Sequence, residues 1–246
     1  MKKIGLLGGM SWESSLNYYK IINEEVKNTL GGLHSAKVVL NSVDFEQIEK
    51  LQHSGDWEAT AKILSDEAKN LQNAEVDFLL ICTNTMHKVA PAIEQNIDIP
   101  LLHIADATAK VLVEDGVKKV ALLGTAFTME QDFYKGRLED KFNLEVIVPN
   151  KQDINTIHKI IYDELCLGII KESSKQKYLQ IINKLQTQNI QGVILGCTEI
   201  AMLIEQKDCD IKLYDTTTIH AKSAVEYAIL DDSNIVETYI YTIKDI

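Results

Sequence analysis

Two short polar segments follow apolar runs and carry the side chains best suited to proton transfer. Thr83 follows the apolar residues 78–82, and Cys197 follows residues 192–196. A thiol with an ordinary pKa of ~8.5 becomes a usable base after modest tuning. An alcohol lies nearer the ~15.7 of water, a gap of about 7 pKa units or roughly 10 kcal/mol. Cys197 is therefore the stronger candidate base, and Thr83 can give up its proton only through a relay by a neighbour or by water.

An internal repeat relates these two positions. Three pairs of segments resemble each other in order: residues 5–8 and 121–124, residues 80–84 and 194–198, and residues 99–102 and 211–214. Their offsets are 124 − 8 = 116, 197 − 83 = 114 and 211 − 99 = 112. Single matches between aliphatic segments are common, but three in order with slowly drifting offsets predict two similar halves.

The elements that must position these residues are short buried strands alternating with amphipathic helices. Aliphatic runs predict strands at residues 3–7, 37–41, 78–82, 120–123, 145–148 and 192–195. Apolar residues every three or four positions, such as Leu16, Tyr19 and Ile22, predict helices between them. The fold class we predict is α/β, with two pseudo-symmetric parallel-sheet domains and the active site in the cleft between them. The first domain comprises residues 1–108 plus 215–246, and the second comprises residues 109–214.

This arrangement has a chemical consequence for Thr83 and Cys197. Ligands of parallel α/β folds bind outside the carboxyl ends of the strands, where both residues are expected. Side chains that approach one bound molecule from opposite halves can remove a proton from one face of a carbon and return a proton to the other face. Inversion of a stereocentre needs this geometry. The alternative is that Cys197 is a small buried hydrophobic residue at a strand end.

The segments around these positions resemble a known family. Residues 8–10, residues 82–87 and residues 196–199 are similar to the signature segments of the aspartate/glutamate/hydantoin racemase superfamily. The similarity is greatest to a bacterial branch with a threonine and cysteine catalytic pair. The resemblance implies a cofactor-independent racemase that uses Thr83 and Cys197 without pyridoxal phosphate or a metal. The substrates it implies are L- and D-aspartate or glutamate, or, with broad specificity, a wider range of amino acids. It also implies a homodimer.

The sequence departs from the usual family pattern at the first catalytic position. Most members carry a cysteine directly before the residue equivalent to Asn84, whereas this chain has Thr83 there and Cys82 one position earlier. Successive strand residues point to opposite faces, so Cys82 is not expected to replace the missing thiol. Two mechanisms stay open: two-base transfer by Cys197 and Thr83, or chemistry by Cys197 alone, as in a relative such as arylmalonate decarboxylase. A third alternative is a small-ligand binding protein without catalysis.

The residues expected to bind the substrate flank the same strand ends. They are Met10, Gln52, Asn84, Thr85, Met86, Thr198 and Glu199. Asn84, Thr85 and Thr198 suit the α-carboxylate, and Glu199 suits the ammonium group. Gln52 is the expected contact of the substrate side chain, where the resemblance implies arginine in other members. A neutral amide binds a carboxylate less strongly than a guanidinium does, so we expect broader specificity or weaker binding of aspartate.

Other positions near these segments have looser assignments. His87 is expected one turn further along the following helix, and His103 and Asp215 occupy equivalent positions of the repeat and are expected to support the site. Cys166 stands where the resemblance implies lysine. Residues 231–246 form an Ile/Tyr/Thr-rich tail that suits an added edge strand or a subunit contact.

Composition excludes several classes of function. The net charge is −11 and Arg137 is the only arginine, which disfavours nucleic-acid and membrane-surface binding. The four cysteines form no CxxC pair, so neither a metal site nor a disulfide framework is expected, and free thiols fit the cytoplasm. No nucleotide-binding glycine motif is present. The partner that the family resemblance implies is a small amino-acid substrate.

Overall fold

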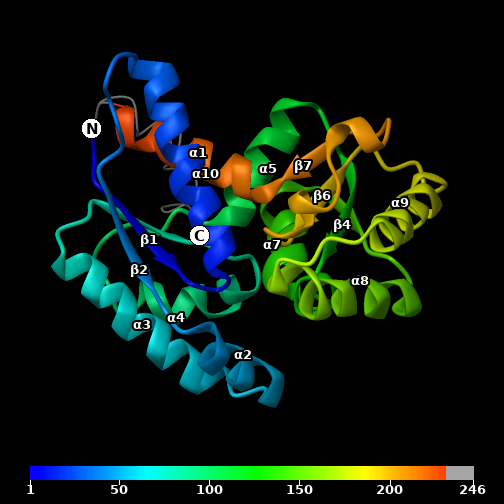
Figure 1. The fold of residues 1–246 in the computed structure, drawn as a ribbon, viewed down its shortest axis with the longest axis horizontal. Helices are drawn as coiled ribbons and strands as arrows, with labels where there is room; N and C mark the ends of the chain where they lie inside the picture. Colours follow the sequence, from blue (N-terminus) through cyan, green and yellow to red (C-terminus); the bar gives the residue numbers. More distant parts are fainter. Residues whose placement is uncertain (231–246) are drawn as a thin grey trace.

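Two parallel sheets form the framework of the computed structural model, which describes residues 1–230 (Figure 1). The first sheet has the order β2-β1-β3, with β1 at Ile4–Gly8, β2 at Val38–Ser42 and β3 at Phe78–Ile81. The second has the order β5-β4-β6-β7, with β4 at Lys119–Gly124, β5 at Glu145–Ile147, β6 at Val193–Gly196 and β7 at Leu213–Asp215. The predicted α/β class with parallel sheets in two groups is confirmed.

The sequence repeat is also a repeat in strand pairing. In the second sheet, β6 pairs with β7 through Val193 and Leu213, and in the first half Leu79 of β3 forms a parallel bridge to Leu101. The offsets are 193 − 79 = 114 and 213 − 101 = 112, the same as those of the sequence matches. The strands that precede Thr83 and Cys197 therefore have equivalent neighbours. In the first half β3 lies between β1 and the bridge at Leu101, and in the second half β6 lies between β4 and β7.

Helices cover these sheets. They are α1 (Trp12–Leu30), α2 (Phe45–Ser54), α3 (Trp57–Asn73), α4 (Ala90–Glu94), α5 (Ile104–Glu114), α6 (Ala126–Glu130), α7 (Asp132–Phe142), α8 (Lys151–Asp163), α9 (Glu172–Gln186) and α10 (Thr216–Ile229). Short 3-10 helices are η1 (Thr85–Val89), η2 (Leu165–Leu167), η3 (Ile200–Met202) and η4 (Gln206–Asp208). Side-chain oxygens of Ser11, Asp44 and Asn150 accept backbone N–H bonds at the starts of α1, α2 and α8, so polar residues fix where these helices begin.

The strand ends next to Cys197 approach each other closely. A Cβ atom on Gly124 would lie 2.7 Å from the carbonyl oxygen of Gly196, and one on Gly196 would lie 2.9 Å from the carbonyl oxygen of Leu123. Glycine at both positions therefore lets the ends of β4 and β6 pack together, and Cys197 follows directly on this edge.

The last helix of each half packs against the other half. Buried residues of α5, including Ile104 and Leu112, belong to the hydrophobic core of the second sheet. Buried residues of α10, including Ala224 and Val225, belong to the core that contains β1 and α1. Figure 1 shows α10, in orange, beside α1. The chain thus crosses between the halves at α5 and at α10.

The boundaries predicted at residues 108/109 and 214/215 stay predictions. We propose that the first of them lies nearer residue 103, because the whole of α5 follows that residue and its buried face packs with the second core.

The tail at residues 231–246 lies outside the described residues. Within residues 1–230, no helix combines the length and apolarity needed to cross a bilayer.

We predict that Leu112→Ala destabilises the protein, whereas Val113→Ala on the same helix does not. Leu112 is fully buried against the second core, and Val113 is 52% exposed. Truncating a buried leucine costs about 2–5 kcal/mol, because it leaves a cavity. An exposed substitution changes stability by about 0.5 kcal/mol or less. Urea unfolding followed by circular dichroism measures both, and equal stabilities would show that α5 does not pack as described.

Candidate active site

A small cavity lies between the two halves at the carboxyl ends of the strands. Its lining residues come from both halves: Met10, Phe45, Gln52, Thr83, Asn84, Thr85, Met86, Thr125, Ile161, Tyr162, Cys166, Gly196, Cys197 and Glu199. Only about 20 Å³ of it is open to the centre of a water molecule, which is room for about one water. An amino acid is several times larger, so the residues that line the cavity must move to admit one.

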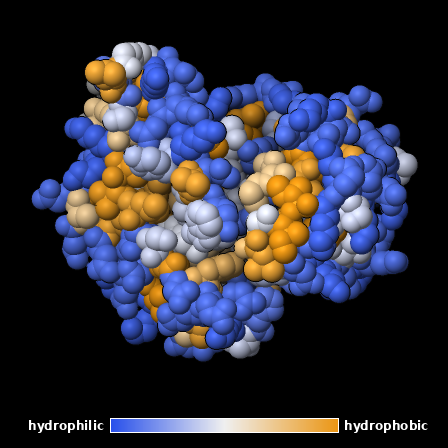
Figure 2. Space-filling model, viewed as in Figure 1, coloured by the Kyte–Doolittle hydropathy of each residue, from blue (hydrophilic) through white to orange (hydrophobic). Residues whose placement is uncertain are grey.

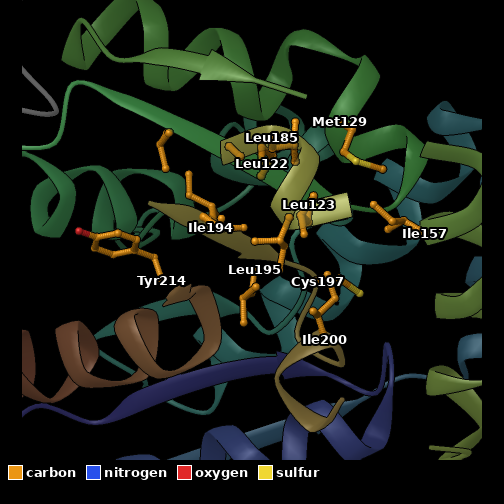
Figure 3. Packing of buried hydrophobic residues seen from close by; sticks show 14 of the residues in the cluster. Leu122, Leu123, Met129, Ile157, Leu185, Ile194, Leu195, Cys197, Ile200 and Tyr214 are labelled. Carbon is orange, nitrogen blue, oxygen red and sulfur yellow. The ribbon is translucent and has the colours of Figure 1, made fainter. Parts of the chain in front are cut away.

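Thr83 and Cys197 both line this cavity, as the repeat predicts. Thr83 lies two residues beyond the end of β3 and is half-buried, and Cys197 follows β6 and is 7% exposed. Figure 3 shows Cys197 near Ile200, beside the buried side chains of the second core. Cys82 is fully buried in the core of the first half and does not line the cavity. Its thiol cannot act in place of Thr83.

Glu199 connects the thiol to the opposite half. The Cys197 Sγ donates a hydrogen bond to Glu199 Oε2 at 2.9 Å, and Thr198 Oγ1 donates to the same oxygen at 2.8 Å. The hydroxyl of Ser11, at the start of α1, donates to Glu199 Oε1 at 2.7 Å. With 3% of its surface exposed, Glu199 is a buried carboxylate whose two oxygens are held by three donors.

This environment raises the pKa of Cys197 well above the usual value. Burial is the largest cause, and the negative charge of Glu199 follows; the backbone N–H of Glu199 acts in the opposite direction. In the unliganded site the thiol is therefore protonated and bonded to a carboxylate that can accept its proton. Cys197 and Glu199 together can act as a base when a positive charge enters the cavity.

Three further hydrogen bonds surround the cavity, and the first two of them join the halves. Gln52 Nε2 donates to the Tyr162 hydroxyl at 2.5 Å, and the hydroxyls of Thr85 and Thr125 lie 3.0 Å apart. Asn84 Nδ2 donates to Thr216 Oγ1 at 3.1 Å. Opening the cavity therefore disturbs a defined set of polar contacts.

Asn84, which lines the cavity, has one amide atom without a hydrogen-bond partner. The Thr216 hydroxyl donates to the carbonyl of Leu195 at 2.8 Å, so it must accept from Asn84, which identifies the bonded amide atom as nitrogen. The other amide atom, Oδ1, is buried without a hydrogen-bond partner. A buried acceptor of this kind is suited to an N–H donor of a ligand.

The structure brings together six of the seven predicted binding residues. Met10, Gln52, Asn84, Thr85, Met86 and Glu199 line the cavity, whereas Thr198 does not line it and acts on Glu199. Sequence reasoning missed Phe45, Ile161 and the contact of Tyr162 with Gln52. These side chains come from α2 and α8, whose residues no motif marks. His103 and Asp215 are the N-cap residues of α5 and α10, which is a supporting role.

The lining carries no positive side chain. None of its residues is lysine or arginine, and Arg137 on α7 is bound by both carboxylate oxygens of Asp106 on α5. In the part of the chain that the structure describes, no group of three histidine, cysteine or acidic residues is placed to hold a metal ion. The charge available in the cavity is that of Glu199.

Comparison with known proteins agrees with this geometry. The family model described as Asp/Glu/Hydantoin racemase matches residues 7–224. The chain belongs to this family. The chain is 27% identical over 177 residues to the broad specificity amino-acid racemase RacX of Bacillus subtilis, covering 69% of this chain and 73% of RacX.

Solved structures of similar proteins share the whole fold. The structure of a candidate Asp/Glu racemase from Yersinia pestis has a TM-score of 0.87 at 53% identity, and the match covers 94% of this chain and all of the other. An aspartate racemase homologue from Pyrococcus horikoshii has a TM-score of 0.80 at 35% identity, with 93% and 99% covered. Family membership identifies this chain as an isomerase of the amino-acid racemase type, which leaves the binding-protein alternative without support.

In this member of the racemase family, we predict that Glu199→Gln lowers the pH at which the Cys197 thiol ionises. The substitution removes the charge that raises the thiol pKa, so the midpoint must move down. Iodoacetamide alkylation between pH 6 and 11, read on the Cys197 peptide by mass spectrometry, measures the midpoint. Cys209 is the internal control, because its pKa responds to burial, Asp208 and Asp210 and not to Glu199. An unchanged or higher midpoint for Cys197 contradicts the assignment.

Proposed function

We propose that the protein racemises amino acids without a cofactor, by proton transfer at Cα between Cys197 on one face and Thr83 on the other. The observation that carries this proposal is that both residues line one cavity and follow repeat-related strands of opposite halves. Pyridoxal phosphate usually stabilises the carbanion of such reactions through a lysine Schiff base, and no lysine lines this cavity.

The base in this proposal is the pair of Cys197 and Glu199. The sulfur takes the Cα proton as the thiol proton passes to Glu199 Oε2 along the existing 2.9 Å bond. The substrate ammonium supplies the positive charge that the lining lacks. It lowers the free-energy cost of the negative charge that develops on the sulfur as the thiol proton moves to Glu199. The electron pair left by the Cα proton becomes the negative charge of an enolate-like carboxylate, which nearby hydroxyl and N–H donors stabilise.

Thr83 completes inversion as the acid on the other face. Its O–H bond breaks as the new Cα–H bond forms. A water relay that starts from protonated Glu199 restores the hydroxyl proton in the same step and returns Glu199 to its carboxylate form, since a free alkoxide or hydroxide would cost roughly 10 kcal/mol. The Asn84 Oδ1 atom accepts an N–H of the substrate ammonium, because it is the buried acceptor without a partner. Asn84 therefore orients the ammonium group in this proposal, whereas Glu199 accepts the thiol proton of Cys197.

Substrate choice follows from the uncharged wall around Gln52, Tyr162, Phe45 and Cys166. A second carboxylate, as in aspartate or glutamate, would meet neutral donors beside the negative Glu199. We therefore propose broad specificity, with aspartate and glutamate accepted less selectively than by members that carry arginine at the Gln52 position. The proposed setting is the cytoplasm.

The predicted homodimer is also part of this proposal. Trp12, Leu16 and Tyr19 lie on one face of α1 and are 63%, 56% and 50% exposed. Figure 2 shows apolar surface on both sides of the line where the halves meet. This surface suits contact with a second copy of the chain.

We predict that the wild-type protein exchanges the Cα proton of amino acids for deuterium in D2O and inverts the centre. Cys197→Ser lowers both rates by about 10²–10⁴-fold, because the base is lost. Thr83→Ala retains exchange from the enantiomer whose proton Cys197 removes but loses inversion, and Thr83→Ser keeps both. NMR measures exchange, and chiral chromatography measures inversion.

Each alternative gives a different result in this experiment. Inversion that persists in Cys197→Ser contradicts the assignment of the base. A Thr83→Ala variant that inverts like the wild type contradicts two-base transfer and favours the one-thiol mechanism. Absence of exchange with every L- and D-amino acid tested contradicts racemisation altogether.

We further predict that Gln52→Arg shifts specificity toward aspartate relative to its neutral isostere asparagine. A charge-assisted bond is worth about 1.5 kcal/mol more than a neutral one, so the ratio of kcat/KM values is expected to rise about tenfold. Tyr162→Phe is the matched control, because it breaks the Gln52 contact without adding charge. A ratio that rises equally in both variants, or in neither, contradicts the role of Gln52.

A further inference from the structure

Three buried histidines lie where the chain crosses between the halves. His87, His103 and His220 are 1%, 5% and 0% exposed. The ring of His87 lies 4.4 Å from that of His103 and 6.0 Å from that of His220, measured between centroids. None of the three lines the cavity, so the mechanism proposed above does not use them.

The hydrogen bonds of His87 identify its protonation state. The backbone N–H of Ile104 donates to His87 Nε2 at 3.2 Å, so this nitrogen carries no proton. The other nitrogen, Nδ1, therefore carries the proton and donates it to the carbonyl of Thr83 at 2.8 Å. Burial, followed by the proximity of His220, lowers the pKa of His87, which agrees with a neutral ring that has one donor and one acceptor.

We propose that His87 is a positioning residue that fixes Thr83 relative to Cys197 by bridging the Thr83 carbonyl to the first turn of α5. Ile104 begins α5 and belongs to the same hydrophobic core as Cys197. One imidazole ring thus ties the segment that bears Thr83, in the first half, to the core that bears Cys197, in the second. This inference rests on the proposed function, because it concerns the distance between the two proton-transferring groups.

The equivalent helix start in the second repeat makes a different connection. At the repeat position of Ile104, since 216 − 104 = 112, α10 begins with Thr216. The Thr216 hydroxyl donates directly to the carbonyl of Leu195, two residues before Cys197. Isoleucine has no hydroxyl, so the first half instead connects its helix start to the segment after β3 through the ring of His87.

The test compares variants that remove one or both of these bonds. His87→Asn retains a donor near the position of Nδ1 but loses the acceptor for Ile104, and His87→Ala loses both. His103→Asn is the matched control: His103 caps the same helix through Ala105 N at 3.2 Å, asparagine is also a good N-cap, and no hydrogen bond joins His103 to Thr83.

The decisive readout is the ratio of inversion to Cα exchange in D2O, starting from the enantiomer whose proton Cys197 removes. Misplacing Thr83 is expected to slow inversion by about 10–100-fold in His87→Ala, with a much smaller loss of exchange. His87→Asn is expected to lie between His87→Ala and the wild type, and His103→Asn is expected to keep the wild-type ratio. Inversion and exchange that fall together in His87→Ala contradict positioning of Thr83.

A measurement without turnover keeps the proposal testable if His87→Ala does not fold. Nitrogen-15 NMR of the substrate-free wild type must show His87 protonated at Nδ1 and not at Nε2. The amide resonance of Asn84, which follows the Thr83 carbonyl, must shift in His87→Asn and not in His103→Asn. The Nε2-protonated tautomer, or equal shifts in both variants, overturns the bridge. Absence of exchange in the wild type instead overturns racemisation, and these resonances then decide the bridge alone.

Discussion

The hydrogen bond from Ser11 to Glu199 is the contact on which the rest of the site depends. It joins the start of α1 in the first half to the carboxylate that holds the Cys197 thiol in the second. A buried carboxylate needs donors, and two of its three come from its own segment. The third comes from across the cleft, so closure of the halves and the environment of the thiol are coupled.

In the proposed mechanism, this coupling lets a thiol with a raised pKa act as the base. In the closed, unliganded cavity, burial and Glu199 keep Cys197 protonated. A substrate enters only after the lining moves, because the cavity has room for about one water. When the lining closes again around a zwitterion, the ammonium offsets Glu199 and water is excluded, so the base is strongest only when substrate is present.

Strand patterning and the internal repeat predicted the parallel sheets and the placement of Thr83 and Cys197, and the family resemblance predicted other lining residues such as Gln52. The offsets 114 and 112 reappear in the pairing of Leu79 with Leu101 and of Val193 with Leu213. Sequence alone could not predict the contact of Gln52 with Tyr162, which depends on how two distant helices meet. Nor could it predict that the free amide atom of Asn84 is an acceptor, since that follows from the partner Thr216.

The inequality of the two proton-transferring groups has a thermodynamic limit. Enantiomers have equal free energy, so kcat/KM must be equal in the two directions however different a thiol and an alcohol are. Any difference between the two directions must therefore change kcat and KM by the same factor, so that the direction with the higher kcat also has the higher KM. In the proposed mechanism both directions pass through the proton transfer at Thr83, so the distance at which Thr83 is held affects the rate of inversion in both directions. A rigid connection between Thr83 and the second core therefore matters more here than in a site with two thiols.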